Sequence, residues 1–308
     1  MLRRLLLVLA LTFVMIEPTA AQRVTLAAVG DIQLGRGVGR EMEQHGVDYP
    51  FAKTSPTLKS ADLTFGNLEC ALSKDGRLIP KRFSFKADPA SAAGLARAGF
   101  DLLALANNHS VDCGRERLSE SLAILNKYGL RGTGAGENMT QARAPVMVTR
   151  KGIKIAFLAR TMVSVDGMVY REDVPGPAMF ELEELLSDIK AAKQQADLVV
   201  ISLHWGVEFT RQPQEEQRRI AHQIIDAGAC LLLGHHPHTP QPLEWYHRGL
   251  IAYSLGNFVF DAVLPHSQEG VILQCILSKR GVEKAKLIKT TIDHGQPQII
   301  VTAKGNSG

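Results

Sequence analysis

Polar side chains that can bind metal ions stand directly after several apolar runs of this 308-residue sequence. Carboxylates neutralise divalent cations, imidazole rings bind transition metals, and a carboxamide oxygen can complete the coordination shell. Two adjacent metals lower the pKa of a bridging water and bind both the attacking and the leaving oxygen of a displacement reaction. The residue types therefore indicate metal-dependent hydrolysis with one or two divalent ions, drawn from Mn, Zn, Fe and Mg. The side chains concerned are Asp31, Glu69, Asn108, His109, His204, His236 and His238.

Each of these side chains also has a simpler structural explanation. Asp31 follows Gly30 after an apolar run and could cap a turn, and the pair Asn107 and Asn108 could be turn formers only. His204, inside the segment LHWG, could be a hydrogen-bonded histidine of the core. One polar centre explains all of these positions together, so it is the hypothesis we favour.

The late histidines form a spaced pair. His236 and His238 flank Pro237, and in an extended segment their side chains would point in the same direction. His235 would then point away from them, so we expect it to be structural.

Strand-like runs alternate with helix-like segments over most of the chain. Strands are expected at residues 24–31, 61–69, 100–109, 154–160, 197–206, 229–238 and 249–260. Helices are expected at 89–99, 115–129, 181–195 and 213–228. This alternation predicts an α/β fold whose strands are covered on both faces, with the polar centre beyond their carboxyl ends. From Gly270 onward, strand-like runs without helices predict an antiparallel finish.

The first 21 residues are typical of a secretory signal peptide: two arginines, an apolar run, then Pro18 and small residues. We therefore expect residues 22–308 to form a single exported domain, periplasmic or extracellular, with an uncleaved membrane anchor as the alternative. No later stretch is long and apolar enough to suggest a transmembrane segment. With 35 basic and 31 acidic residues and no basic run, nucleic acid is not an expected partner.

The four cysteines show no CxxC spacing, which argues against zinc bound by thiolates. Cys70 and Cys113 each follow a run that ends in a candidate ligand. A disulfide between them is possible if those two ends are neighbours, and sequence alone leaves this open.

Several segments, in the same order along the chain, resemble those of the bacterial capsule-synthesis family called CapA or PgsA. This family is linked to poly-γ-glutamate and lies within the calcineurin-like metallophosphoesterase superfamily. The matching segments are VGDIQLGRGV, SADLTFGNLECALS, KRFSFKA, AGFDLLALANNHSVDCG, GTGAG, VVISLHWGVEF, LLLGHHPHTPQPLEWY and GLIAYSLGNFVFD. The resemblance implies a four-layer αββα sandwich of the metallophosphoesterase type.

The resemblance also implies roles for individual residues. Asp31 and His109 are the implied catalytic residues, with His109 as general acid for the leaving group. Gln33 stands where the superfamily's Asp-x-His motif has its histidine, and Asn67 stands where a second motif has aspartate, so we expect Glu69 to do the bridging. The implied metal ligands are Asp31, Glu69, Asn108, His204, His236 and His238.

Four further residues are expected to contact the substrate. Arg82 and Lys86, like Lys81 in the same segment, could hold an anionic group, although a solvated strand face is an equally good explanation. Asn67 lies beside the expected ligands, and Asn257 ends another strand and could reach the same centre or serve its turn only.

Two functions remain open at this level. The first is a metal-dependent hydrolase or transferase of the cell envelope, acting on a phosphoester or on an acidic polymer such as poly-γ-glutamate. The second is a non-catalytic factor that uses the same cleft to bind polymer or a membrane synthase complex. The fold cannot choose between them, because one fold serves many functions.

Overall fold

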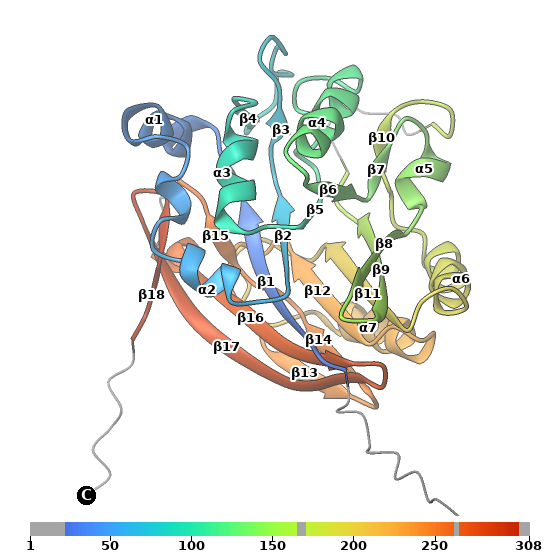
Figure 1. The fold of residues 1–308 in the computed structure, drawn as a ribbon. Coiled ribbons are helices and arrows are strands. Elements are labelled where there is room, and N and C mark those ends of the chain that lie inside the picture. Colours follow the sequence, from blue (N-terminus) through green and yellow to red (C-terminus); the bar gives the residue numbers. More distant parts are fainter. Residues whose placement is uncertain (1–21, 165–170, 262–264, 302–308) are drawn as a thin grey trace, which may run out of the picture.

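Two β-sheets packed face to face form the centre of the computed structural model, and helices cover both outer faces (Figure 1). The structure describes residues 22–164, 171–261 and 265–301. The expected signal peptide lies outside the described residues. The α/β prediction, with its four layers and antiparallel finish, is confirmed.

The first sheet contains both ends of the described chain. Its strands are β1 (Val24–Ile32), β2 (Leu63–Leu68), β5 (Leu102–Ala104), β6 (Arg131–Thr133), β15 (Asn257–Val259), β16 (Glu269–Ser278), β17 (Gly281–Asp293) and β18 (Gln296–Ile299). They run in the order β18-β17-β16-β1-β2-β5-β6, and β15 pairs with the end of β1. β1, β2, β5 and β6 are parallel neighbours, whereas β16 joins β1 in the antiparallel direction.

The second sheet is parallel at its centre. Its strands are β8 (Val146–Arg150), β9 (Ile153–Thr161), β11 (Leu198–His204), β12 (Leu231–His235), β13 (Leu243–Tyr246) and β14 (Gly249–Ala252). Their order is β13-β14-β12-β11-β9-β8, with only the two edge pairings antiparallel. Two small two-stranded sheets complete the set: β3 (Ala71–Leu72) with β4 (Lys86–Ala87), and β7 (Ala135–Gly136) with β10 (Gly176–Pro177).

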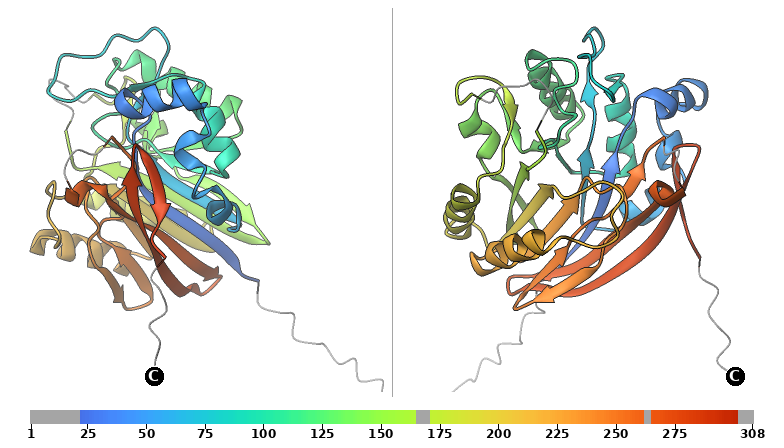
Figure 2. Two further views of the ribbon diagram at one scale, coloured as in Figure 1. Left: turned by 90° about the vertical axis from the view of Figure 1, so that its left-hand side faces the viewer. Right: turned by 180° about the vertical axis from the view of Figure 1, so that it is seen from behind.

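Helices form the two outer layers (Figure 2). Those against the first sheet are α1 (Arg36–His45), α2 (Ser55–Lys59), α3 (Ser91–Ala98) and α4 (Glu116–Lys127); those against the second are α6 (Leu182–Lys193) and α7 (Glu215–Asp226). Three short elements lie beside them: α5 (Met139–Arg143), η1 (Tyr49–Phe51) and η2 (Pro265–Gln268). The four predicted helices are present. Helix α1 was not predicted because it contains Gly37 and Gly39, and α2 and α5 have only five residues each.

Alternate side chains of β1 enter different cores. Leu26 and Ala28 belong to the core between the sheets, whereas Ala27 and Val29 pack toward α1 to α4. Both faces of the strand are therefore buried, as expected for a parallel sheet covered by helices. No helix in the described ranges is long and apolar enough to cross a membrane.

Two predicted strands are shorter than expected, and both changes affect the site. β5 ends at Ala104, so Asn108 and His109 lie in the turns that follow it. The run 249–260 breaks into β14 and β15 at a turn where Gly256 has a φ of +69°. The second part, β15, leaves the second sheet and places Asn257 beside Asp31 of β1.

Candidate metal centre

The end of β1 is held at the middle of the centre by its neighbours. Asp31 is opposite Asn67 of β2 and Asn257 of β15, and its backbone N–H donates to the carbonyl of Gly256 at 3.0 Å. A Cβ at Gly30 would lie 1.8 Å from that same carbonyl oxygen. Only glycine therefore allows the turn to approach β1 so closely. The result is an Asp31 side chain with no exposed surface.

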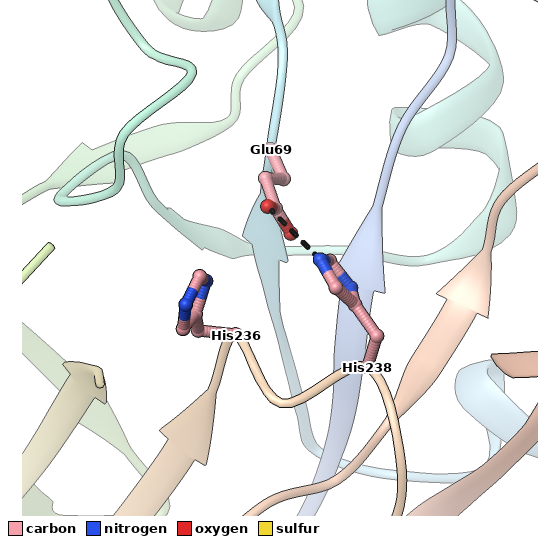
Figure 3. A group of neighbouring side chains, drawn as sticks. All are labelled: Glu69, His236 and His238. Carbon is pink, nitrogen blue, oxygen red and sulfur yellow. Dashed lines mark ion pairs between the residues drawn. The ribbon is translucent and has the colours of Figure 1, made fainter. Parts of the chain in front are cut away.

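Two overlapping groups of ligand atoms form beyond the strand ends. One contains Glu69, His236 and His238, and the other contains Asp31, Glu69 and His204. Within each group the ligand atoms lie within 4.8 Å of one another, and all of these side chains are buried. Figure 3 shows Glu69 pointing toward His238, with Oε1 and Nε2 separated by 3.8 Å. Glu69 belongs to both groups, which is the position of a ligand that bridges two cations.

The carboxylate of Glu69 lacks a hydrogen-bond partner within the described residues. Both of its oxygens are buried and unpaired. The Nε2 atoms of His109, His204 and His238 are each 3.8 Å from Oε1, which is too far for a hydrogen bond. An unpaired buried carboxylate is costly, and a divalent cation would satisfy it. The donor set therefore fits a metal ion, in agreement with carboxylate and imidazole preferences.

Burial and mutual charge shift the pKa values of the two carboxyl groups at the centre in opposite directions. Burial, and then the charge of Asp31, raise the pKa of Glu69 well above its usual value. For Asp31, burial is outweighed by hydrogen bonds from His235 and His238, and its pKa falls well below normal.

The imidazoles divide in the same way. Burial would lower the pKa of His238, but Glu69 and Asp31 raise it to about 10. Burial and the charge of His238 lower the pKa of His236 to about 3. The pKa of His204 is also lowered, by burial and by His236. A neutral imidazole, as at His204 and His236, is the form that binds metal.

His236 and His238 point in the same direction, as expected, but the backbone conformation that causes this is not the expected one. His236 and His238 both face the centre, with ring centroids 5.9 Å apart. They do so through left-handed backbone conformations, with φ of +92° and +54°, and not through an extended segment. His235 does not point away: its Nδ1 lies 3.4 Å from Oδ1 of Asp31. The strand alternation that we assumed ends at His235, the last residue of β12.

Asn108 and His109 each lie beside a member of the ligand groups. Oδ1 of Asn108 is 2.8 Å from Nε2 of His204, which places the carboxamide beside the second group. Nδ1 of His109 is 2.8 Å from the buried carboxylate of Asp112, so Nε2 is the nitrogen that faces Glu69. Burial is the largest influence on His109 and lowers its pKa.

Asp112 is not among the residues predicted from the sequence, and Lys81 was expected only as a cation for the substrate. The Lys81 ammonium lies 2.5 Å from Asp112 and donates to the backbone carbonyl of Asn108 at 2.8 Å. Asp112 could have been found from its spacing. It follows His109 by three residues, and this spacing places the side chains of His109 and Asp112 on the same side of a turn. The three residues form one buried chain of contacts that fixes the His109 ring.

Asn67 and Asn257, both expected to contact the substrate, each hydrogen-bond to a candidate metal ligand. Asn67 donates to Asp31 at 2.8 Å and accepts from Asn107 at 3.1 Å, and it is buried. Oδ1 of Asn257 is 2.8 Å from Nδ1 of His238, and its amide donates to Ser267 at 2.8 Å. Their hydrogen-bonding groups are therefore occupied in orienting the candidate ligands.

Arg82 and Lys86, also expected to contact the substrate, have different surroundings. Arg82 is exposed and its guanidinium lies over the ring of Phe83. Lys86 donates to the carbonyl of Gly76 at 3.1 Å. Of the three cations in this segment, Lys81 is the one that reaches the centre.

The possible disulfide is not formed. Cys70 and Cys113 are both free and buried, and burial raises the pKa of their thiols to about 12 and about 11. Neither thiol joins a ligand group.

Comparison with known proteins places this geometry in context. The family model described as bacterial capsule synthesis protein PGA_cap matches residues 25–262. The sequence is 33% identical over 290 residues to the capsule biosynthesis protein CapA of Bacillus anthracis, covering 92% of this chain and 71% of that protein. It is also 33% identical over 272 residues to the PGA biosynthesis protein CapA of Bacillus subtilis (strain 168), covering 87% and 72%.

A solved structure shares the fold at low sequence identity. The 5'-nucleotidase precursor from Thermus thermophilus superposes with a TM-score of 0.56 and 12% identity, over 89% of this chain and 56% of that one. At this identity the likeness concerns the fold alone. It agrees with the arrangement of two sheets between outer helices described above.

Proposed function

Because this chain belongs to the bacterial capsule synthesis protein family, we propose that it is an exported, metal-dependent hydrolase or transferase of capsule polymer synthesis. Its substrate would be a phosphoester or a bond in an acidic polymer. The name of the Bacillus subtilis relative, a PGA biosynthesis protein, supports poly-γ-glutamate as that polymer.

One observation carries the proposal. Glu69 is completely buried, has no hydrogen-bond partner for either oxygen, and takes part in both ligand groups. A cation would satisfy a carboxylate in this state, and the two overlapping groups provide ligand atoms for one or two cations. A purely structural carboxylate would be paired with a donor.

The residues around the centre then have distinct roles. Asp31, Glu69, Asn108, His204, His236 and His238 would hold the metal. When bound, a divalent ion supplies positive charge that makes water more acidic and stabilises negative charge in the transition state.

The proton is supplied by the chain itself. Asp112 holds Nδ1 of His109, so protonated His109 donates from Nε2 to the leaving oxygen or nitrogen. Because Lys81 contacts Asp112, the segment that carries Lys81 is fixed beside the proton donor.

Metal analysis and hydrolysis assays test this function together. The mature protein is purified, its metal content is measured, and phosphomonoesters, phosphodiesters and poly-γ-glutamate are offered as substrates. We expect bound divalent metal and turnover that is lost in His109→Asn with the metal retained. Turnover unchanged in His109→Asn would refute the proton-donor role, and a protein that binds no divalent metal would refute the function.

A second function has a specific observation in its favour. Gln33 stands at the position of a superfamily histidine, and both of its side-chain amide atoms are buried without partners among the described residues. A centre with one ligand fewer could serve to bind polymer or a membrane synthase complex without catalysis. Metal binding and polymer binding without turnover of any substrate would select this function.

Export is a separate part of the proposal and rests on the N-terminal sequence pattern. Cell fractionation with N-terminal sequencing of the mature protein tests it. Cleavage after residue 21 is expected, and a cytoplasmic protein that retains its first residues would contradict it.

A further inference from the structure

An aromatic pocket opens directly onto the candidate metal centre. It has a volume of about 120 Å³, and its lining includes His109 and His238 together with Phe83, Phe85, Phe209 and Phe260. The ring of Phe85 contacts His109 at an interplanar angle of 30°, with centroids 4.1 Å apart, and the centroid of Phe260 lies 5.0 Å from that of His238. The walls are therefore aromatic, and two imidazoles of the proposed active centre form part of the lining.

Two of these rings are partly exposed to solvent, so packing in the hydrophobic core does not account for them. Phe83 is 49% exposed and Phe209 is 41% exposed. Phe209 also has a φ of +62°, a conformation that bulky residues rarely adopt. Such backbone strain persists where the surrounding structure enforces it, often at ligand sites. Here the N–H of Phe209 donates to the carbonyl of Pro237 at 2.8 Å, between the two ligand histidines.

The charges of the pocket do not suit an additional anionic group. Apart from its imidazoles, Arg36 is the one cation among the lining residues that the structure describes, and it is paired with Asp261 at 3.1 Å. The exposed Glu208 adds a negative charge. The guanidinium of Arg36 lies over the rings of Phe83 and Phe85, which extends a flat wall. These features favour a neutral, planar occupant over a second carboxylate or phosphate.

The volume limits the size of the occupant. An apolar cavity of about 150 Å³ can hold one benzene molecule. This pocket has about 120 Å³ and opens to solvent, so it accommodates at most one ring, whose outer edge and the rest of a larger molecule lie outside.

We propose that this pocket binds a planar aromatic or heteroaromatic ring carried by the substrate next to the bond that is cleaved at the metal centre. The inference rests on the proposed function and specifies its substrate class: a phosphoester whose leaving group, or adjoining substituent, contains such a ring. The competing explanation is that the phenylalanines only exclude water from the metal.

Phosphonates that cannot be hydrolysed separate these explanations. The full-length mature protein, loaded with metal, is titrated with phenyl-, cyclohexyl- and methylphosphonate by calorimetry, at a pH where all three are dianions. Wild-type protein should bind phenylphosphonate about tenfold more tightly than methylphosphonate, because ring stacking adds to apolar burial. It should also prefer the flat phenyl ring to the thicker cyclohexyl ring.

Variants locate this preference. Phe209→Ala should abolish the phenyl preference and leave methylphosphonate affinity unchanged, whereas Phe209→Tyr should retain it. Trp245→Ala removes an aromatic side chain that is 53% exposed on β13 and outside the pocket lining, and it is the matched control.

Each outcome decides the proposal. Loss of phenyl preference in Phe209→Ala alone supports it. The proposal is overturned if the wild type shows no preference for phenylphosphonate, or if Phe209→Ala loses affinity equally for all three phosphonates. Either result leaves the proposed hydrolase function intact. Absence of binding by all three phosphonates to the metal-loaded wild type would remove the phosphoester function together with this pocket assignment.

Discussion

Replacement of Glu69 by glutamine is the sharpest test of the metal centre, because it should have opposite effects with and without metal. The substitution keeps the shape of the side chain and removes its charge. In the metal-free protein, the carboxylate is buried without a partner for either oxygen, and burial with the nearby charge of Asp31 raises its pKa. A charged group in this position costs about 1–3 kcal/mol or more.

The magnitudes follow from these contacts. Because an amide is cheaper to bury than a carboxylate, we expect metal-free Glu69→Gln to be more stable than metal-free wild type by about 1–2 kcal/mol. This corresponds to a rise in melting temperature of about 2–8 °C for a domain of this size. Metal at a hundredfold excess over Kd should stabilise the wild type by about 2.7 kcal/mol. If loss of the ligand weakens binding about 100-fold, the same metal concentration should stabilise the variant by only about 0.4 kcal/mol.

Thermal unfolding monitored with a chelator and with added Mn²⁺ or Zn²⁺ measures both effects. The matched control is Glu208→Gln, which removes the same charge from an exposed position at the mouth of the pocket and should change neither value appreciably. A metal-free Glu69→Gln protein that melts well below the wild type would show that the carboxylate has a stabilising partner. An unchanged metal-induced shift would show that Glu69 is not a ligand.

Three further outcomes are expected. Asp112→Asn should lower kcat about 100-fold or more with unchanged metal content, because it removes the carboxylate that orients His109; an unaltered kcat would exclude that role. Gly30→Ala should lower the melting temperature, since its Cβ would lie 1.8 Å from a carbonyl oxygen; an unchanged melting curve would contradict the close approach. Burial raises the pKa of Asp62, but hydrogen bonds from Lys151 and the backbone outweigh burial and lower this pKa overall. The ionised Asp62 side chain therefore stabilises the fold at a pH above its usual pKa, and this stabilisation is lost as the pH falls below that value. Chemical unfolding of wild type and Asp62→Asn should therefore differ at neutral pH and converge in acid; a difference that is constant with pH would be evidence against this linkage.

The sequence was sufficient to predict the fold class and the strands that end at the centre. An apolar run predicts a buried strand, and a polar residue at the end of that run, such as Asp31 after Gly30, must lie at the carboxyl end of the strand. The carboxyl ends of several such strands meet at one edge of the sheet. Asp31, Glu69, His204, His236 and His238 lie within two overlapping groups for this reason.

Hydrogen-bond assignments around the centre could not be predicted. Only the register of β1 with its neighbours shows that Asn67 and Asn257 contact Asp31 and His238. The direction of His235 depends on where β12 ends and the left-handed turns begin, and no local periodicity specifies that point.

The aromatic pocket could not be predicted from the sequence for a similar reason. Phe83, Phe209 and Phe260 are far apart in the sequence, and each alone is compatible with ordinary packing. Their convergence is a property of the loops and not of any strand or helix pattern.

The pairing of β1 with β16 has a consequence for how the polypeptide is made. Val24 of β1 is opposite Leu277 of β16. The first strand of the described chain is therefore paired on this edge by a strand that is synthesised much later. During synthesis, the backbone N–H and C=O groups on this edge of β1 remain unpaired until most of the chain has been made, and unpaired strand edges promote association between molecules. A ribosome-bound or partly synthesised chain should consequently depend on chaperones that bind extended segments, and a chain cut before β16 should aggregate rather than fold into a smaller version of the protein.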